Sequence, residues 1–150
     1  MTEILATTVD KFTFRVPTDR FYDEEGLWVR FEGEDIVSVG LGDFLQQSSG
    51  DVAFAEVKPA GTVLEAGQPL ASIETIKATL ELESPIPGTV VEVNPAMASR
   101  PEIINQHPYG DGWLARIRVP DWETARRRLL EPKRYFDLMK GRAEEESAKS

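Results

Sequence analysis

The chain has 150 residues, with 26 acidic and 17 basic side chains, a net charge of −9 and no cysteine. The lack of cysteine excludes disulfides, thiolate nucleophiles and zinc–thiolate sites, and the negative charge argues against binding to nucleic acid. No apolar run approaches the roughly 20 residues of a membrane span, and the N-terminus lacks the basic and apolar regions of a secretory signal. We therefore expect a single-domain cytoplasmic protein with no membrane partner.

The N-terminal part of the chain predicts short strands. An alternating run at 12–16, ended by Pro17, indicates an edge strand or an extended arm. Runs at 28–31 and 36–39 flank a turn sequence at 32–35, so they predict a hairpin.

A short helix is expected next, near 43–47. Asp43 suits its N-terminus, and Ser48-Ser49-Gly50 suits its end. A further strand is expected at 52–57, so the pattern of short strands and turns continues.

The centre of the chain is a near-palindrome around Lys77. Apolar residues recur at every second position in Pro69–Glu74 and again in Thr79–Ser84, which predicts two half-buried strands. Only a very short connection fits between these strands, so Lys77 should lie at the tip of a hairpin with its ammonium group in water. An exposed lysine is a weak nucleophile at neutral pH, so acylation by another enzyme fits better than catalysis.

Two glycines flank this hairpin. Gly61 lies 16 residues before Lys77 and Gly88 lies 11 residues after it, both in proline-containing turn sequences where we expect a positive φ. Segment 61–65 also resembles segment 88–92, which predicts two similar strands related by a quasi-two-fold axis near the hairpin.

The C-terminal part mixes loop, strand and helix. Residues 94–112 are rich in proline and glycine and predict a loop, and an alternating run follows at 115–119. Asp121 is the expected N-cap of one helix, and Pro132 fits the first turn of a second helix that ends at Gly141.

These elements together predict a mainly β protein, a flattened barrel or sandwich with the short helix near 43–47 and C-terminal helices. The expected organisation is an N-terminal arm at 1–15, a carrier domain at 16–119, a helical extension at 120–141 and a disordered tail at 142–150.

The sequence Glu74-Thr75-Ile76-Lys77-Ala78, with the two glycines, resembles the lipoylation site of biotinyl/lipoyl attachment domains. Such domains are barrel-sandwich hybrids. The resemblance implies lipoic acid attached covalently to Lys77, with Glu74, Gly61 and Gly88 serving recognition and turn geometry. Biotin carriers typically place methionine on both sides of the lysine, whereas Ile76 and Ala78 stand here, so lipoic acid is the favoured cofactor.

The wider chain is similar to the H-protein family of the glycine cleavage system. This similarity spans about 16–119 and rests on four further segments, namely 27–30, 37–44, 88–94 and 104–114. It implies a carrier whose lipoyl arm moves intermediates and reducing equivalents between partner enzymes, and it implies no catalytic residue and no metal. The sole histidine, His107, lies in a loop and suggests no triad or metal site.

The chain departs from the family pattern before Trp28. Glycine cleavage H proteins usually carry a histidine–glutamate pair there, in the cleft that shelters the loaded arm, whereas this chain has Gly26-Leu27. The chain also has Thr75-Ile76 in place of the usual serine–valine pair, and its C-terminal extension is long. In these features it resembles the H-like lipoate-binding proteins of heterodisulfide-reductase-like sulfur oxidation. We take that subtype as the favoured prediction.

The alternatives are a glycine cleavage H protein that carries an aminomethyl group and an unlipoylated docking adaptor. The partners that the resemblance implies are lipoate-protein ligase, dihydrolipoyl dehydrogenase, and either a heterodisulfide-reductase-like complex or the glycine cleavage enzymes.

Overall fold

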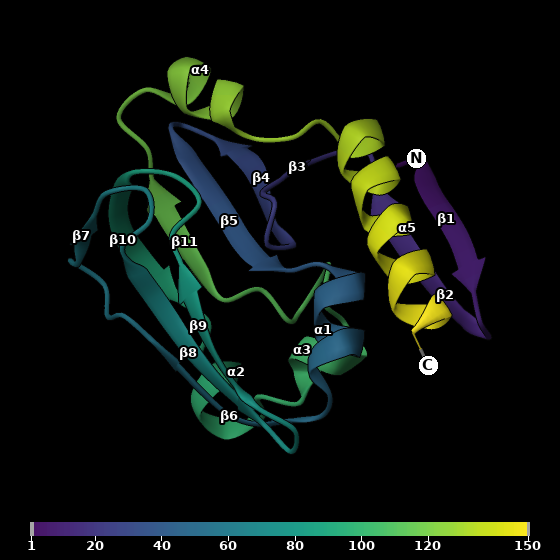
Figure 1. Cartoon of the computed structure of the whole chain (residues 1–150). Coiled ribbons are helices and arrows are strands. Elements are labelled where there is room, and N and C mark those ends of the chain that lie inside the picture. The colour runs from purple at the N-terminus through teal and green to yellow at the C-terminus, as the bar shows by residue number, and fades with distance from the viewer. Residues whose placement is uncertain (1, 150) are drawn as a thin grey trace.

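The computed structural model describes residues 2–149 and contains three antiparallel sheets (Figure 1). A two-stranded sheet is formed by β1 (Ile4–Val9) and β2 (Phe12–Pro17). A three-stranded sheet has the order β6-β8-β9, with β6 (Val52–Val57), β8 (Pro69–Thr75) and β9 (Thr79–Glu83). A six-stranded sheet has the order β3-β4-β5-β11-β10-β7, with β3 (Phe21–Tyr22), β4 (Leu27–Gly33), β5 (Ile36–Leu41), β7 (Val63–Leu64), β10 (Gly88–Val93) and β11 (Ala115–Arg118).

The helices are short except for the last. They are α1 (Asp43–Ser49), α2 (Ala96–Ser99), α3 (Ile103–Gln106), α4 (Trp122–Ala125), the 3₁₀ turn η1 (Arg126–Arg128) and α5 (Pro132–Ala148). The predicted mainly β, flattened barrel-sandwich fold with a short helix after residue 42 and C-terminal helices is therefore confirmed.

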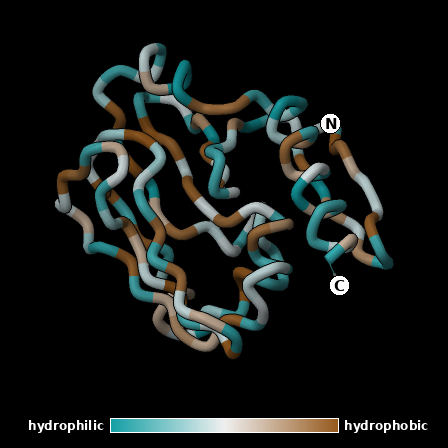
Figure 2. Tube along the Cα trace, viewed as in Figure 1, coloured by the Kyte–Doolittle hydropathy of each residue, from teal (hydrophilic) through white to brown (hydrophobic). Residues whose placement is uncertain are grey.

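The main core joins the six-stranded and three-stranded sheets. Figure 2 shows hydrophobic and hydrophilic stretches alternating along their strands, as expected for strands that bury one face. The fully buried side chains include Val39 of β5, Ile73 of β8, Val90 of β10 and Ile117 of β11. Because both arms of the Lys77 hairpin contribute to this core, the tip of the hairpin is carried by a rigid support.

A second core lies between the β1–β2 hairpin, β3, β4 and α5. Figure 1 shows α5 lying across this hairpin at one side of the molecule. Tyr22 and Tyr135 stack with ring centroids 4.5 Å apart, and Met139 and Ala143 continue the buried face of α5 at four-residue spacing. This second core attaches both terminal segments to the carrier domain.

Several local predictions are confirmed. The 28–31 and 36–39 runs pair as β4 and β5, around a turn in which Glu34 and Asp35 have positive φ. Asp121 caps α4 by accepting a hydrogen bond from the Thr124 N–H, and Pro132 stands in the first turn of α5.

The two ends of the chain differ from the prediction. The arm expected at 1–15 is a regular hairpin, because an additional strand, β1, pairs with β2; Met1 lies outside the described residues. Helix α5 does not end at Gly141 but continues to Ala148, so the disorder expected over 142–149 is wrong, and Ser150 lies outside the described residues. A helical glycine costs about 1 kcal/mol relative to alanine, and burial of Ala143 against the hairpin helps to offset this.

Residues 94–112 also contain more regular structure than a loop. They form the one-turn helices α2 and α3, which place Met97, Ile103 and Ile104 in the main core. Asn94 holds this segment by donating to the Asp111 and Trp113 carbonyl oxygens, both at 2.7 Å.

Candidate functional site

Lys77 lies at the tip of the hairpin formed by β8 and β9. Strand β8 ends at Thr75 and β9 begins at Thr79, so three exposed residues, 76–78, form the connection. The Thr75 N–H donates to the Ala78 carbonyl oxygen at 2.8 Å and closes the turn. The predicted hairpin and the exposed position of Lys77 at its tip are confirmed.

The hydroxyl group of Thr75 organises this turn. The side chain is buried, and its Oγ1 accepts hydrogen bonds from the Lys77 N–H at 3.1 Å and the Ala78 N–H at 3.0 Å. The same hydroxyl donates to the Ser49 carbonyl oxygen at 2.7 Å. One short polar side chain therefore fixes the backbone on both sides of the lysine, as threonine hydroxyls do in turns.

The hairpin tip is docked onto the end of α1. Besides the Thr75 contact, the Ile76 N–H donates to the Asp51 carbonyl oxygen at 3.0 Å, and Lys77 Nζ donates to the Ser48 carbonyl oxygen at 3.1 Å. The last carbonyl groups of a helix have no partners within it, so the tip supplies donors that α1 lacks. Lys77 thus lies at a defined place although its side chain is exposed.

Gly50 allows the lysine side chain to lie against the backbone after α1. It has φ +92°, and a Cβ atom there would lie 2.9 Å from Lys77 Cδ. Asn105 of α3 fixes this segment, because its amide donates to the Gly50 carbonyl oxygen at 3.1 Å and its Oδ1 accepts from the Val52 N–H at 2.9 Å. The sequence did not predict these roles of Gly50 and Asn105. The turn-forming residues Ser48-Ser49-Gly50 did indicate a turn after α1.

The two predicted glycines serve different geometries. Gly61 has φ +95° in the turn before β7, which agrees with the prediction. Gly88 begins β10 and has no positive φ; a Cβ atom there would lie 2.4 Å from the Arg118 carbonyl oxygen and 2.5 Å from Ile117 Cγ2. The turn role predicted for Gly88 is therefore wrong, and the residue is needed for close packing of β10 on β11.

The two similar segments, 61–65 and 88–92, contribute to two paired strands. β7 and β10 are antiparallel, with Gly88 opposite Leu64 and Thr89 opposite Val63. The Gly61 N–H donates to the Val90 carbonyl oxygen, and the Val90 N–H donates to the Thr62 carbonyl oxygen. Adjacent antiparallel strands are related by a local two-fold axis, so this pairing agrees with the predicted symmetry.

Of the other predicted residues, Glu74 is exposed in β8 opposite Thr79, three residues before Lys77. His107 is the C-cap of α3, and its backbone carbonyl accepts hydrogen bonds from the Gly110 and Gly112 N–H groups. Gly26-Leu27 lies at the start of β4, where Asp23 accepts hydrogen bonds from both N–H groups.

Comparison with known proteins places this geometry in a family. The glycine cleavage H-protein family model matches residues 20–142. The chain is 40% identical to the glycine cleavage system H protein of Rubrobacter xylanophilus over 120 residues, which cover 80% of this chain and 91% of that protein. The chain belongs to the glycine cleavage H-protein family.

Two further members of the H-protein family support the comparison. A glycine cleavage system H protein of Thermus thermophilus is 37% identical, with 85% of this chain and 98% of that protein covered. The crystal structure of the H protein from Mycobacterium marinum superposes with a TM-score of 0.70 at 28% identity, covering 81% of this chain and 97% of that one.

Membership of the H-protein family establishes the general role. H proteins carry lipoic acid covalently on a lysine and are components of a multi-enzyme system without being enzymes themselves. The chain is accordingly a lipoyl carrier, and the exposed, backbone-anchored hairpin tip suits that attachment. The described residues contain no helix that is long and apolar enough to cross a membrane.

Proposed function

We propose that Lys77 carries the lipoyl group and that the protein is the H component of a glycine cleavage system. The observation that carries this proposal is the hairpin tip itself, where Lys77 projects from a turn whose backbone is fixed by Thr75 and by the end of α1. The matched relatives are named as glycine cleavage H proteins, which favours this function over the sulfur-oxidation subtype predicted from the sequence.

The hairpin tip exposes one amine, that of Lys77, to a ligase. Ile76, Lys77 and Ala78 are exposed, whereas the flanking strands enter the core. An exposed turn can enter the active site of a modifying enzyme without unfolding of the sheet, and Glu74 on β8 lies within the same recognisable surface. Lipoate-protein ligase is the partner that would acylate Lys77.

Once bound, the lipoyl group supplies a dithiolane that accepts an aminomethyl group and reducing equivalents. The protein's own residues hold the root of the arm in place, because the hydrogen bonds of Thr75 restrict the backbone to one conformation. A tether of this kind keeps its cargo at high effective concentration near each partner. The partners we propose are the glycine cleavage enzymes, including dihydrolipoyl dehydrogenase.

A heterodisulfide-reductase-like sulfur-oxidation carrier is the second candidate. One observation favours it, namely the Gly26-Leu27 pair in place of the histidine–glutamate pair that glycine cleavage H proteins usually have. The partner would then be a heterodisulfide-reductase-like complex instead of the glycine cleavage enzymes.

The attachment site is tested by intact mass after incubation with lipoate-protein ligase, ATP and lipoic acid. We expect one lipoyl adduct on the wild type and on Lys58→Arg, which changes an exposed lysine elsewhere, and none on Lys77→Arg. An adduct that persists in Lys77→Arg would overturn the assignment, and an unmodified wild type would favour the docking adaptor.

The pathway is tested with the lipoylated protein and glycine decarboxylase. We expect glycine-dependent release of CO₂ that requires the lipoyl group, with the unlipoylated protein as the control. Release no greater than that of the control, combined with reduction or loading by a heterodisulfide-reductase-like complex, would support the second candidate.

A further inference from the structure

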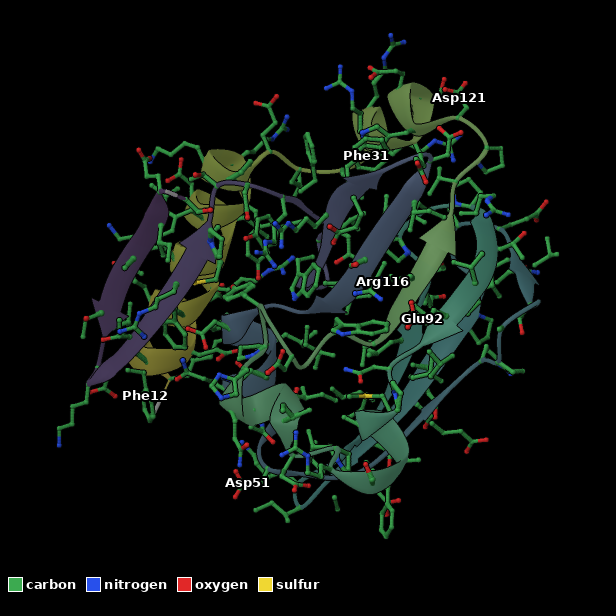
Figure 3. All side chains as sticks on the ribbon, turned by 180° about the vertical axis from the view of Figure 1, so that it is seen from behind. Phe12, Phe31, Asp51, Glu92, Arg116 and Asp121 are labelled. Carbon is green, nitrogen blue, oxygen red and sulfur yellow. The ribbon has the colours of Figure 1, made fainter. Side chains whose placement is uncertain are left out.

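A cavity of about 380 Å³ opens beside Lys77. Its walls come from the tip of the β1–β2 hairpin, from α1, from the side chain of Lys77 and from the last turns of α5, and we call it the hairpin cavity. Figure 3 shows Phe12 at the end of the β1–β2 hairpin, where the hairpin meets the end of α5. The volume lies within the range of about 300–1,000 Å³ that is usual for ligand sites.

The inner wall of the hairpin cavity is aromatic. Phe12 and Phe14 of β2 and Phe44 of α1 line it, and the rings of Phe14 and Phe44 meet edge to face with centroids 5.1 Å apart. Phe12 is 59% exposed although it is a large apolar side chain. Gln47 and Ser48 supply polar groups beside Lys77. Asp10 and Glu146 also line the cavity, so the three aromatic rings are the apolar part of a mixed wall. Such a wall can hold the apolar chain of a ligand on the rings with its polar end at Gln47 and Ser48.

The elements around the cavity are tied to one another, so the space is present before any ligand enters. The Arg15 N–H donates to Asp43 Oδ2 at 3.0 Å, and Gln47 Nε2 donates to the Thr13 carbonyl oxygen at 2.9 Å. These bonds join β2 to α1. On the other side, Met139 and Ala143 pack α5 into the second core.

Most of the cavity is built from segments that the family model does not include. The family model matches residues 20–142, and β1, β2 and the end of α5 lie outside this range. Seven of the eleven residues that line the cavity come from these outer segments. The hairpin cavity is therefore built mainly from residues outside the matched range.

A second hollow lies on the side of β9. This groove, of about 280 Å³, is lined by Leu27 and Leu45, by residues 79–83 of β9 and by Glu25. It adjoins the position where glycine cleavage H proteins usually have the histidine–glutamate pair. Lys77 lines the hairpin cavity, and its aliphatic stem lies against Gly50 with Nζ at the Ser48 carbonyl oxygen.

We propose that the resting arm, whether oxidised or reduced, lies in the hairpin cavity and not in the groove beside Leu27. This inference rests on the proposed lipoylation of Lys77. An amide at Nζ keeps one N–H group, which can still donate to the Ser48 carbonyl oxygen and direct the arm toward Phe44 and Phe12. The apolar chain and the sulfur-bearing end of the arm are then packed on aromatic rings, in the cavity that Lys77 itself lines, whereas Lys77 does not line the groove beside Leu27. The terminal segments would thus shield the arm between visits to partner enzymes.

The absence of cysteine allows a direct test, because the two sulfur atoms of the reduced arm are the only thiols in the protein. The lipoylated protein is reduced, and the rate of alkylation by iodoacetamide is followed by intact mass, with free dihydrolipoamide as the reference. We expect the wild-type arm to react about fivefold more slowly than the reference, which corresponds to an arm that is exposed about one-fifth of the time.

Two substitutions should abolish this protection. Phe12→Asp places a charge on the aromatic wall at an exposed position, and Ser147→Trp fills the cavity from α5. We expect both to bring the alkylation rate to within about twofold of the reference. The matched control is Phe54→Asp, which changes another exposed phenylalanine that does not line the cavity and should leave the arm protected.

The opposite groove is tested by Glu25→Trp, which changes an exposed residue that lines it and should leave the alkylation rate unchanged. The proposal is overturned if the wild-type arm reacts as fast as the reference, or if Glu25→Trp alone increases the rate. Each variant is first checked for the lipoyl adduct by mass. A protein that gains no adduct refutes the lipoylation of Lys77, whereas a lipoylated but unprotected arm refutes only its position.

Discussion

Thr75 shows how one side chain can define the position of another. The side chain of Lys77 is exposed, and among residues 2–149 its ammonium group donates a hydrogen bond only to the Ser48 carbonyl oxygen. Its backbone is restrained instead by the buried hydroxyl of Thr75, which bonds groups on both sides of the turn and on α1. The usefulness of the exposed lysine therefore depends on a buried neighbour two residues away.

Thr75→Val is predicted to weaken both the turn and the protein. Valine has nearly the same shape but leaves the Ser49 carbonyl oxygen and two N–H groups without their partner, which should lower the free energy of unfolding by about 1–3 kcal/mol. Urea denaturation measures this change, and the rate of lipoylation should fall with it. Thr75→Ser keeps the hydroxyl and is the control; equal stability of the valine and serine variants would contradict the role given to the hydroxyl.

At the scale of secondary structure, the site depends on contacts between elements that are distant in sequence. The end of α1 receives the hairpin tip, and Asn105 of α3 holds the connecting segment in place. Strand β10 approaches β11 closely at Gly88, which keeps the six-stranded sheet continuous between β11 and β7. The hairpin is thus presented by several elements that each contribute one or two contacts.

Gly88→Ala is predicted to destabilise the sheet. The added Cβ atom would lie 2.4 Å from the Arg118 carbonyl oxygen, and backbone cannot move aside cheaply. We expect a loss of about 1–3 kcal/mol in the free energy of unfolding, measured by urea denaturation. Gly110→Ala is the matched control, because no atom lies within 4 Å of the added group and its φ is not positive; the two variants should not be equally stable.

On the scale of the whole molecule, the protein has two cores that share β3 and β4. The main core holds the carrier scaffold, and the second core attaches the β1–β2 hairpin and α5 to it. Tyr22 and Trp28 belong to the second core, although the neighbouring Leu27 and Val29 face the first. Alternation along β4 therefore lets one strand serve both cores.

Asp23, beside the start of β4, should make the stability of the whole protein depend on pH. Burial raises the pKa of Asp23 to about 6, although the N–H groups of Leu27 and Gly26 act in the opposite direction. A carboxyl group whose pKa is raised by folding stabilises the protein below its unfolded pKa, near 4, and this contribution is lost as the pH rises through about 6.

The Asp23→Asn variant isolates this effect, because the amide oxygen can still accept both hydrogen bonds. We expect the variant to match the wild type near pH 4 and to be more stable by about 3 kcal/mol at pH 7. Urea denaturation across this range gives the difference between the two proteins. A difference that does not change with pH would show that Asp23 titrates at its ordinary pKa in the folded protein.

The sequence by itself determined most of the strands, the Lys77 hairpin and the family, because those depend on local alternation, turn residues and ordered motifs. The period-2 pattern on both sides of Lys77 led directly to β8 and β9. It could not reveal why Gly88 must be glycine, that α5 continues past Gly141, or that Phe12 and Ser147 face one cavity with Lys77. Those features depend on which residues meet across long separations in the chain, and only tertiary packing decides that.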